Sequence, residues 1–246
     1  MRSINDIMNF RTDLSPFLVH LTRRNGADSA RTRLETIITE LALRAGSSLV
    51  SHASFGLSFA RLQDPTISQY FKAVCLTETP LDQIHCLLEI ENRDINLEPY
   101  GLVFLRRPLQ QRGVAPVLYL NNELGDKSAL IRALAEMVDQ NQDLARQILP
   151  FVAVFGSLLP PRGEGTPPPG RIDFLWEREW RWPAFNGSLQ FDQTDVFLGL
   201  CPHEEIDHFE TLFPPIRFVD PTRNMRWYSS ELIGMRQRLN LTQSVV

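Results

Sequence analysis

The chain has few cysteines, and none is arranged for a metal cluster or a redox pair. Its 246 residues include only Cys75, Cys86 and Cys201, an odd number in which no two form a CxxC motif. Reduced thiols are typical of the cytoplasm, so we expect a cytoplasmic protein. For Cys75 and Cys86 we expect the role of small buried hydrophobic residues, because neighbours on a helix such as His85 and Cys86 do not face each other.

The sequence also lacks the segments that membrane or secreted proteins carry. Apolar runs such as residues 151–159 are too short to span a bilayer, and no cationic segment followed by an apolar core opens the chain. A net charge of −4 and a pI near 5.8 disfavour binding to nucleic-acid backbones. We therefore expect neither a membrane nor a nucleic acid as partner.

Metal and phosphate motifs are missing as well. His203 and His208 lie five positions apart, whereas a zinc-protease helix needs a spacing of four, so we expect no metal. The glycines of residues 160–170 are not followed by the Lys-Ser/Thr pair of a phosphate loop. This Pro/Gly-rich segment instead predicts a surface loop.

What the chain does contain is a mixture of strand and helix patterns without regular βαβ alternation. This order predicts an α+β class, and we expect one domain over 1–246 with 202–246 as a C-terminal helical extension. Asp28 or Ser29, Thr79 and Asp126 are the expected helix caps. An Arg-rich loop is expected at 106–113, and Asn186-Gly187 predicts a hairpin turn. The expected strands are 17–22, 72–76, 100–105, 115–120, 196–201 and 216–219; the expected helices are 30–45, 81–91, 127–149, 202–212 and 229–239.

The most unusual stretch is 176–182, with sequence WEREWRW. Read as a strand, it places Trp176, Arg178, Trp180 and Trp182 on one face, and Glu177, Glu179 and Arg181 on the other. Charged side chains buried beside tryptophans must pair with one another or with a ligand. The stretch is therefore either the wall of a site or a structural salt-bridge ladder.

Two further positions are candidates for chemistry. His20 and Thr22 share one face of the strand 17–22, where an imidazole and a hydroxyl together suit a ribose or an amide. The alternative is a satisfied histidine at a strand end. Glu78 lies at a strand-to-helix turn, a common location for functional side chains.

Five motifs in order resemble a known family: HLT at 20–22, VCLTETPL at 74–81, YGLVF at 100–104, APVLY at 115–119 and EREWR at 177–181. The set is similar to the AbiGi family of abortive phage-resistance proteins, described as the antitoxin half of a two-gene defence system. The resemblance implies an intracellular regulatory protein that binds a partner toxin.

The same series is more distantly similar to the ADP-ribosyltransferase-like fold, a split mixed or antiparallel sheet flanked by helices. That resemblance implies NAD as cofactor, if the chain is an enzyme at all. It gives the ribose to His20 and Thr22, the catalytic carboxylate to Glu179 or Glu177, and the nicotinamide to Tyr100 or Tyr70. Arg23 or Arg24 would hold the pyrophosphate, and Arg181 would keep Glu179 ionised. The alternative function is thus an NAD-dependent ADP-ribosyltransferase or NAD glycohydrolase acting on a macromolecular target.

Overall fold

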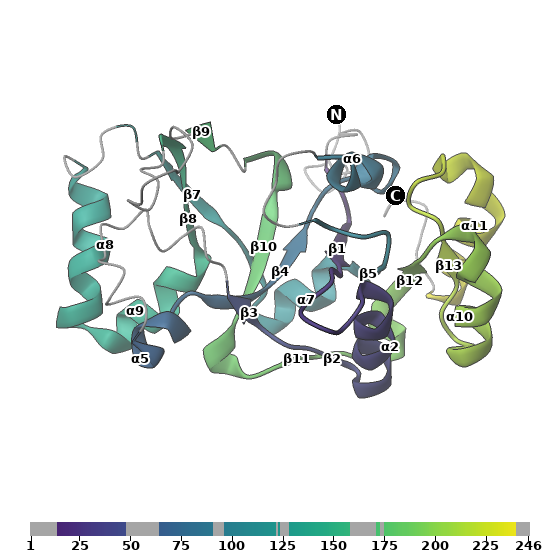
Figure 1. The fold of residues 1–246 in the computed structure, drawn as a ribbon, viewed down its shortest axis with the longest axis horizontal. Helices are drawn as coiled ribbons and strands as arrows, with labels where there is room; N and C mark the ends of the chain where they lie inside the picture. Colours follow the sequence, from purple (N-terminus) through teal and green to yellow (C-terminus); the bar gives the residue numbers. More distant parts are fainter. Residues whose placement is uncertain are drawn as a thin grey trace, which may run out of the picture. The chain divides into compact units, whose positions relative to one another are not determined.

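The computed structural model describes residues 14–47, 64–90, 96–121, 123, 128–157, 171–172 and 175–239. It is a mixed α+β protein with helices and a sheet that contains parallel and antiparallel pairs, which confirms the expected class (Figure 1). The expected loop at 160–170 lies outside the described residues. Within the described part of the chain, no helix combines the length and apolarity needed to cross a membrane.

The chain divides into two compact units. Unit 1 comprises Met1–Ala42, Leu76–Gly113 and Gln190–Val246, and unit 2 comprises Leu43–Cys75 and Val114–Leu189. Each unit has its own core of buried side chains. Whether the two act as one domain stays a prediction.

Unit 1 contains β1 (Phe17–Leu21), β5 (Gly101–Leu105), β12 (Val196–Leu200), β13 (Phe218–Val219) and the last two residues of β4 (Lys72–Thr77), in the order β13-β12-β5-β1-β4. Its best-paired strands are β1 and β5, antiparallel from Phe17 opposite Leu105 to Leu21 opposite Gly101. Gly101 is required there, because a Cβ would lie 2.3 Å from the carbonyl oxygen of His20.

The helices of unit 1 start and end by local chemistry. Helix α2 (Ala30–Glu40) begins where the Ser29 hydroxyl accepts from the Thr32 amide, as expected. It ends at Leu41 in the left-handed region (φ 52°), so the predicted end at Gly46 was wrong. Residues Arg106–Arg112 form helix α7, where we expected a loop, because Leu109 is buried and Gly113 provides a left-handed cap.

The segment after β4 differs from its prediction as well. It begins as a 3-10 turn, η2 (Leu81–Gln83), and continues as the short α6 (Ile84–Leu88). Thr79 caps neither, because its hydroxyl lies 2.7 Å from that of Thr77. The remaining helical elements of unit 1 in the described residues are η7 (Gln193–Asp195), η8 (His203–Glu205), α10 (Ile206–Leu212), η9 (Met225–Tyr228) and α11 (Ser229–Arg238).

In unit 2 the expected strand 115–120 breaks in two at Val117. Strand β6 (Ala115–Pro116) pairs with β10 (Glu179–Pro183), whereas β7 (Leu118–Asn121) pairs in parallel with β8 (Val152–Ser157). Strand β9 (Arg171–Ile172) extends β8 on its other side, and β3 (Gly46–Ser47) pairs with the start of β4. Strands β2 (Ala42–Leu43) and β11 (Leu189–Gln190) make up a separate two-stranded sheet.

The helices of unit 2 are α5 (Pro65–Gln69), α8 (Ala129–Gln140), α9 (Gln142–Ile148) and the turn η4 (Leu149–Phe151). The single helix expected over 127–149 is thus broken at Asn141, whose side chain caps α9 by accepting from Leu144. Ser128 caps α8; Asp126, the expected cap, lies outside the described residues.

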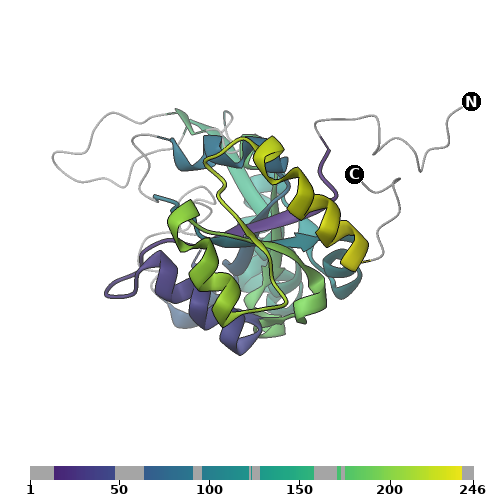
Figure 2. The ribbon, with the colours of Figure 1, turned by 90° about the vertical axis from the view of Figure 1, so that its right-hand side faces the viewer.

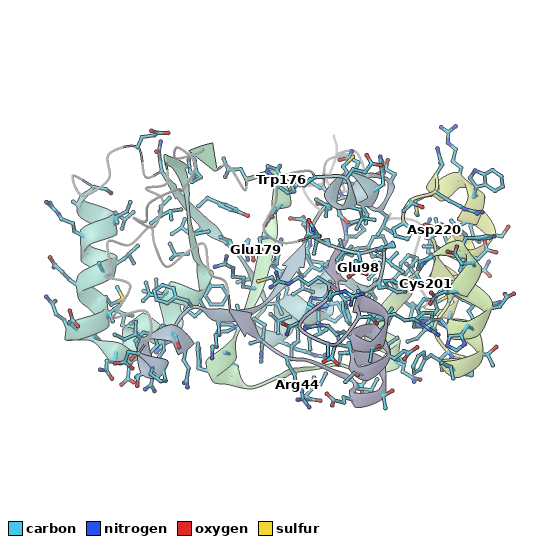
Figure 3. All side chains as sticks on the ribbon, viewed as in Figure 1. Arg44, Glu98, Trp176, Glu179, Cys201 and Asp220 are labelled. Carbon is cyan, nitrogen blue, oxygen red and sulfur yellow. The ribbon has the colours of Figure 1, made fainter. Side chains whose placement is uncertain are left out.

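The tryptophan stretch is only partly a strand. Residues Leu175–Glu177 form the 3-10 turn η5, and Arg178 takes a positive φ of 46° before β10 begins. Trp176, labelled in Figure 3, is therefore exposed. Trp180 is buried, so the predicted single row of tryptophans was wrong. The predicted hairpin at Asn186-Gly187 was also wrong: it is the end of a 3-10 turn, η6 (Ala184–Asn186), and its flanking strands lie in different sheets.

Candidate functional site

The candidate residues of unit 1 meet at the end of β1. The Thr22 amide donates to the carbonyl of Tyr100 at 2.7 Å. The Thr22 hydroxyl lies 2.9 Å from the Ala30 carbonyl and 3.2 Å from the Tyr100 carbonyl, and Thr22 is 2% exposed. Its single proton is therefore already used to hold β1, α2 and the start of β5 together.

The side chain of Tyr100 leads into a charged cluster that no sequence pattern predicts. Its hydroxyl donates to Glu205 Oε1 at 2.9 Å, and Glu205 Oε2 lies 3.0 Å from Arg31 Nε. Burial, and then the bond to Glu205, raise the pKa of the Tyr100 hydroxyl. Its ring centroid lies 6.3 Å from that of Phe209. Tyr100 thus keeps its proton and points at a protein carboxylate.

The same cluster joins α2 to α10, which lie side by side (Figure 2). Arg31 Nη2 lies 2.7 Å from His208 Nε2, and Arg31 also pairs with Glu35 at 3.4 Å. In sequence, 203–208 reads only as a polar helix face. No local signal could have found the contact, because 177 positions separate Arg31 from His208.

In unit 2, Glu179 and Arg181 form a two-point ion pair on one face of β10. Arg181 Nε donates to Glu179 Oε1 at 3.0 Å and Nη2 donates to Oε2 at 2.7 Å. Arg181 Nη1 donates to the carbonyls of Pro150 and Val152 at 3.0 and 3.1 Å. The shared face was predicted; the anchoring of Arg181 to η4 and β8 was not.

Burial and the neighbouring charges shift the pKa values of the groups around this ion pair. Desolvation is the largest single influence on the pKa of Arg181 and lowers it. The attractive interactions with Glu179, Cys75 and Tyr119 together outweigh desolvation, so the pKa rises. Burial, followed by the same carboxylate, raises the pKa of the Cys75 thiol, and burial raises that of Tyr119, whose hydroxyl accepts from the Glu179 amide. The thiol and the phenol stay protonated around a carboxylate that is already bound in two places.

The other candidates are spread over both units. His20 lies on β1 opposite Leu102 and is partly exposed, and the Arg24 amide donates to Glu98. Arg23, in the same segment, is partly exposed. Glu78, buried at 7% exposure, pairs with Arg106, which starts α7.

Among the unit 2 candidates, Glu177 ends η5 outside β10. Tyr70 is buried, with the Arg146 guanidinium 5.9 Å from the centre of its ring. The structure thus brings Thr22 to Tyr100, and Glu179 to Arg181. The predicted meeting of His20 with Glu179 would join unit 1 to unit 2, and it stays a prediction.

Two cysteines differ from the expected burial, and Cys75 is only partly buried. Cys86 is exposed, and its Sγ lies 3.4 Å from Nε2 of His85. We expected a buried thiol and side chains that do not meet. Cys86 is exposed and His85 partly exposed on the short α6, where the imidazole can turn back toward its neighbour.

The residues that the resemblance gives to NAD are largely occupied by protein partners. The Thr22 hydroxyl proton goes to backbone carbonyls, and both oxygens of Glu179 accept from Arg181. These two groups do not fit a bound NAD in the arrangement that the structure has. In the described residues, no three His, Cys, Asp or Glu side chains gather as a metal site would need.

Comparison with known proteins adds no assignment. No protein-family model matches the chain, and neither a curated protein nor a solved structure matches it.

Proposed function

We propose that this chain is the antitoxin, or regulatory component, of a two-gene intracellular phage-defence system, and that it acts by binding a protein partner. The ordered motifs that resemble the AbiGi family support the biological setting. Binding of a protein partner, rather than catalysis, is supported by one observation. The side chains of Thr22, Tyr100 and Glu179 all bind groups of the protein itself. Side chains engaged in this way stabilise a scaffold and leave recognition to the surface.

The first experiment expresses the neighbouring gene alone and together with this chain. The proposal expects the neighbour to arrest growth alone and this chain to restore it, with both proteins in one complex after affinity purification. A neighbour that is harmless alone would contradict the proposal. So would a rescue without any complex.

A second candidate, transfer of ADP-ribose from NAD or hydrolysis of NAD, is favoured by one observation. The His-x-Thr end of β1 and Tyr100 adjoin through the Thr22–Tyr100 backbone bond, as the ADP-ribosyltransferase-like resemblance implies. The occupied Thr22 hydroxyl and Glu179 carboxylate weigh against it.

One variant separates the two functions. Glu179→Gln is compared with wild type, after circular dichroism has established that it is folded. If the chain acts by binding, Glu179→Gln should still restore growth, and neither it nor the wild type should release nicotinamide from NAD. The enzymatic function expects the purified wild type to release nicotinamide and Glu179→Gln to lose at least about 100-fold in rate, as loss of a key transition-state group does.

A further inference from the structure

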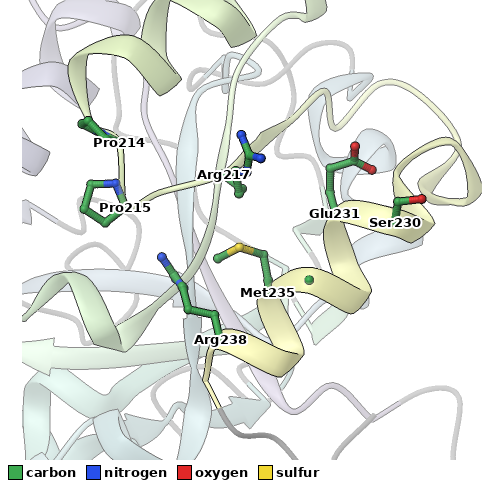
Figure 4. Close-up of a pocket in the computed structure, with 8 residues that line it drawn as sticks. Pro214, Pro215, Arg217, Ser230, Glu231, Met235 and Arg238 are labelled. Atoms are coloured by element: carbon green, nitrogen blue, oxygen red, sulfur yellow. The ribbon is translucent and has the colours of Figure 1, made fainter.

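The C-terminal part of unit 1 contains a groove of about 500 Å³ that none of the motifs predicts. One wall is α11, and the other is the segment that carries Pro214, Pro215 and Arg217 (Figure 4). The groove lies wholly within unit 1.

Two charged side chains of α11, Glu231 and Arg238, line this groove without forming an ion pair in the described part of the chain. Arg238 Nη2 donates to the neutral carbonyl of Val196 at 2.8 Å, and burial lowers the pKa of its guanidinium. Arg238 is exposed and has no carboxylate partner among the described residues, so its guanidinium is accessible to a carboxylate of another molecule.

A glycine lies between these two charges. Gly234 is exposed inside α11, and a Cβ built on it would meet nothing within 4 Å. Neither backbone strain nor internal crowding therefore requires glycine, although glycine weakens a helix interior. What a missing side chain allows is close approach of another backbone to the outside of α11.

We propose that this groove holds α11 of a second copy of the chain, in an antiparallel, two-fold symmetric dimer. Glu231 and Arg238 are seven residues apart, about 10 Å along a helix. An antiparallel copy centred between Gly234 and Met235 sets Glu231 of each copy against Arg238 of the other. A two-fold interface must be self-complementary in this way. The exposed Gly234 lies at the crossing point, where the two helices come closest.

Charge reversal tests the pairing. Wild type sediments as a concentration-dependent dimer, and Glu231→Arg or Arg238→Glu alone weakens dimerisation by about tenfold or more, because like charges then face each other. The double variant Glu231→Arg/Arg238→Glu restores it, since the pair is only exchanged. Arg236→Glu makes the same charge change outside the groove lining and leaves the dimer intact. Circular dichroism and melting of each variant establish that it is folded.

Bulk at the crossing point gives a second readout. Gly234→Gln folds without strain, because open space surrounds the position, yet it separates the helices and weakens the dimer. A wild type that stays monomeric at every concentration overturns the proposal. So does a dimer that is indifferent to both single reversals. Growth rescue by a monomeric chain would leave the antitoxin function standing, so the two failures are distinguishable.

Discussion

Arg181 holds the carboxylate of Glu179 at two points, Nε to Oε1 at 3.0 Å and Nη2 to Oε2 at 2.7 Å, while its Nη1 binds two backbone carbonyls. The Arg181 side chain is 5% exposed and the Glu179 side chain 11%. A planar guanidinium suits such two-point binding, which lysine cannot reproduce. The pair therefore connects β10 to η4 and β8 within unit 2.

Removing the guanidinium should destabilise the protein strongly. Arg181→Met leaves a buried carboxylate without its counter-ion, at a cost of about 3–5 kcal/mol in the free energy of unfolding. Arg181→Met/Glu179→Gln should recover part of that loss, because no buried charge remains. Urea unfolding checks both. Arg132→Met, on the exposed side of α8, is the matched control and should change stability by less than about 0.5 kcal/mol. Equal stability of Arg181→Met and wild type would contradict the structural role.

Thr22 offers a smaller and separate test. Thr22→Val removes the buried hydroxyl that bonds to the Ala30 carbonyl and should lower the free energy of unfolding by about 1–3 kcal/mol. Thr22→Ser retains the hydroxyl and should cost less. Thr36→Val, which removes an exposed hydroxyl on α2, serves as control. If Thr22→Val unfolds at the wild-type urea concentration, the hydroxyl has no structural role.

The three thiols should react at very different rates. Cys86 is exposed beside His85, Cys201 is buried, and the pKa of Cys75 is raised by burial and then by Glu179. A thiol reagent at neutral pH should therefore modify Cys86 first, the partly exposed but protonated Cys75 more slowly, and the buried Cys201 only on unfolding. Peptide mass spectrometry after timed labelling identifies the site. Prior labelling of Cys201 would contradict the described core, and Cys86→Ser should abolish the fast phase.

Stability should fall in mildly alkaline solution. Burial, and then Glu205, raise the pKa of the Cys201 thiol in the folded protein. In the unfolded chain the thiol ionises at about pH 8.5. Above that pH the folded state therefore binds more protons than the unfolded state. The stabilisation is complete below about pH 8.5 and is lost progressively as the pH rises toward the folded pKa. Melting temperatures in a pH series measure the slope, which should be shallower in Cys201→Ala. Identical slopes would refute the prediction.

Local patterns were enough for much of the framework. Alternation predicted β1, a cap at Asp28 or Ser29 predicted the start of α2, and the two-residue period of a strand predicted that Glu179 and Arg181 share a face. Each depends on residues within a few positions of one another, where sequence spacing fixes direction. The mixed α+β class followed from the order of these elements.

Local patterns failed where packing or a special backbone angle decided the outcome. The positive φ of Arg178 ends the tryptophan strand early, and the burial of Leu109 makes a helix of an arginine-rich loop. In the sequence, the alternation of the tryptophan stretch favours a longer strand, and the arginine-rich composition favours a loop.

The candidate site depended on tertiary structure most of all. The sequence by itself determined which side chains carry groups suited to chemistry, namely those of the His-x-Thr strand and the Glu-x-Arg strand. It also contains no metal-binding motif. Only the fold decided what they bind, because the partners of Tyr100 and Arg181 come from distant segments, Glu205 and the carbonyls of Pro150 and Val152. Spacing along a strand sets which way a side chain points. The path of the whole chain sets what it meets there.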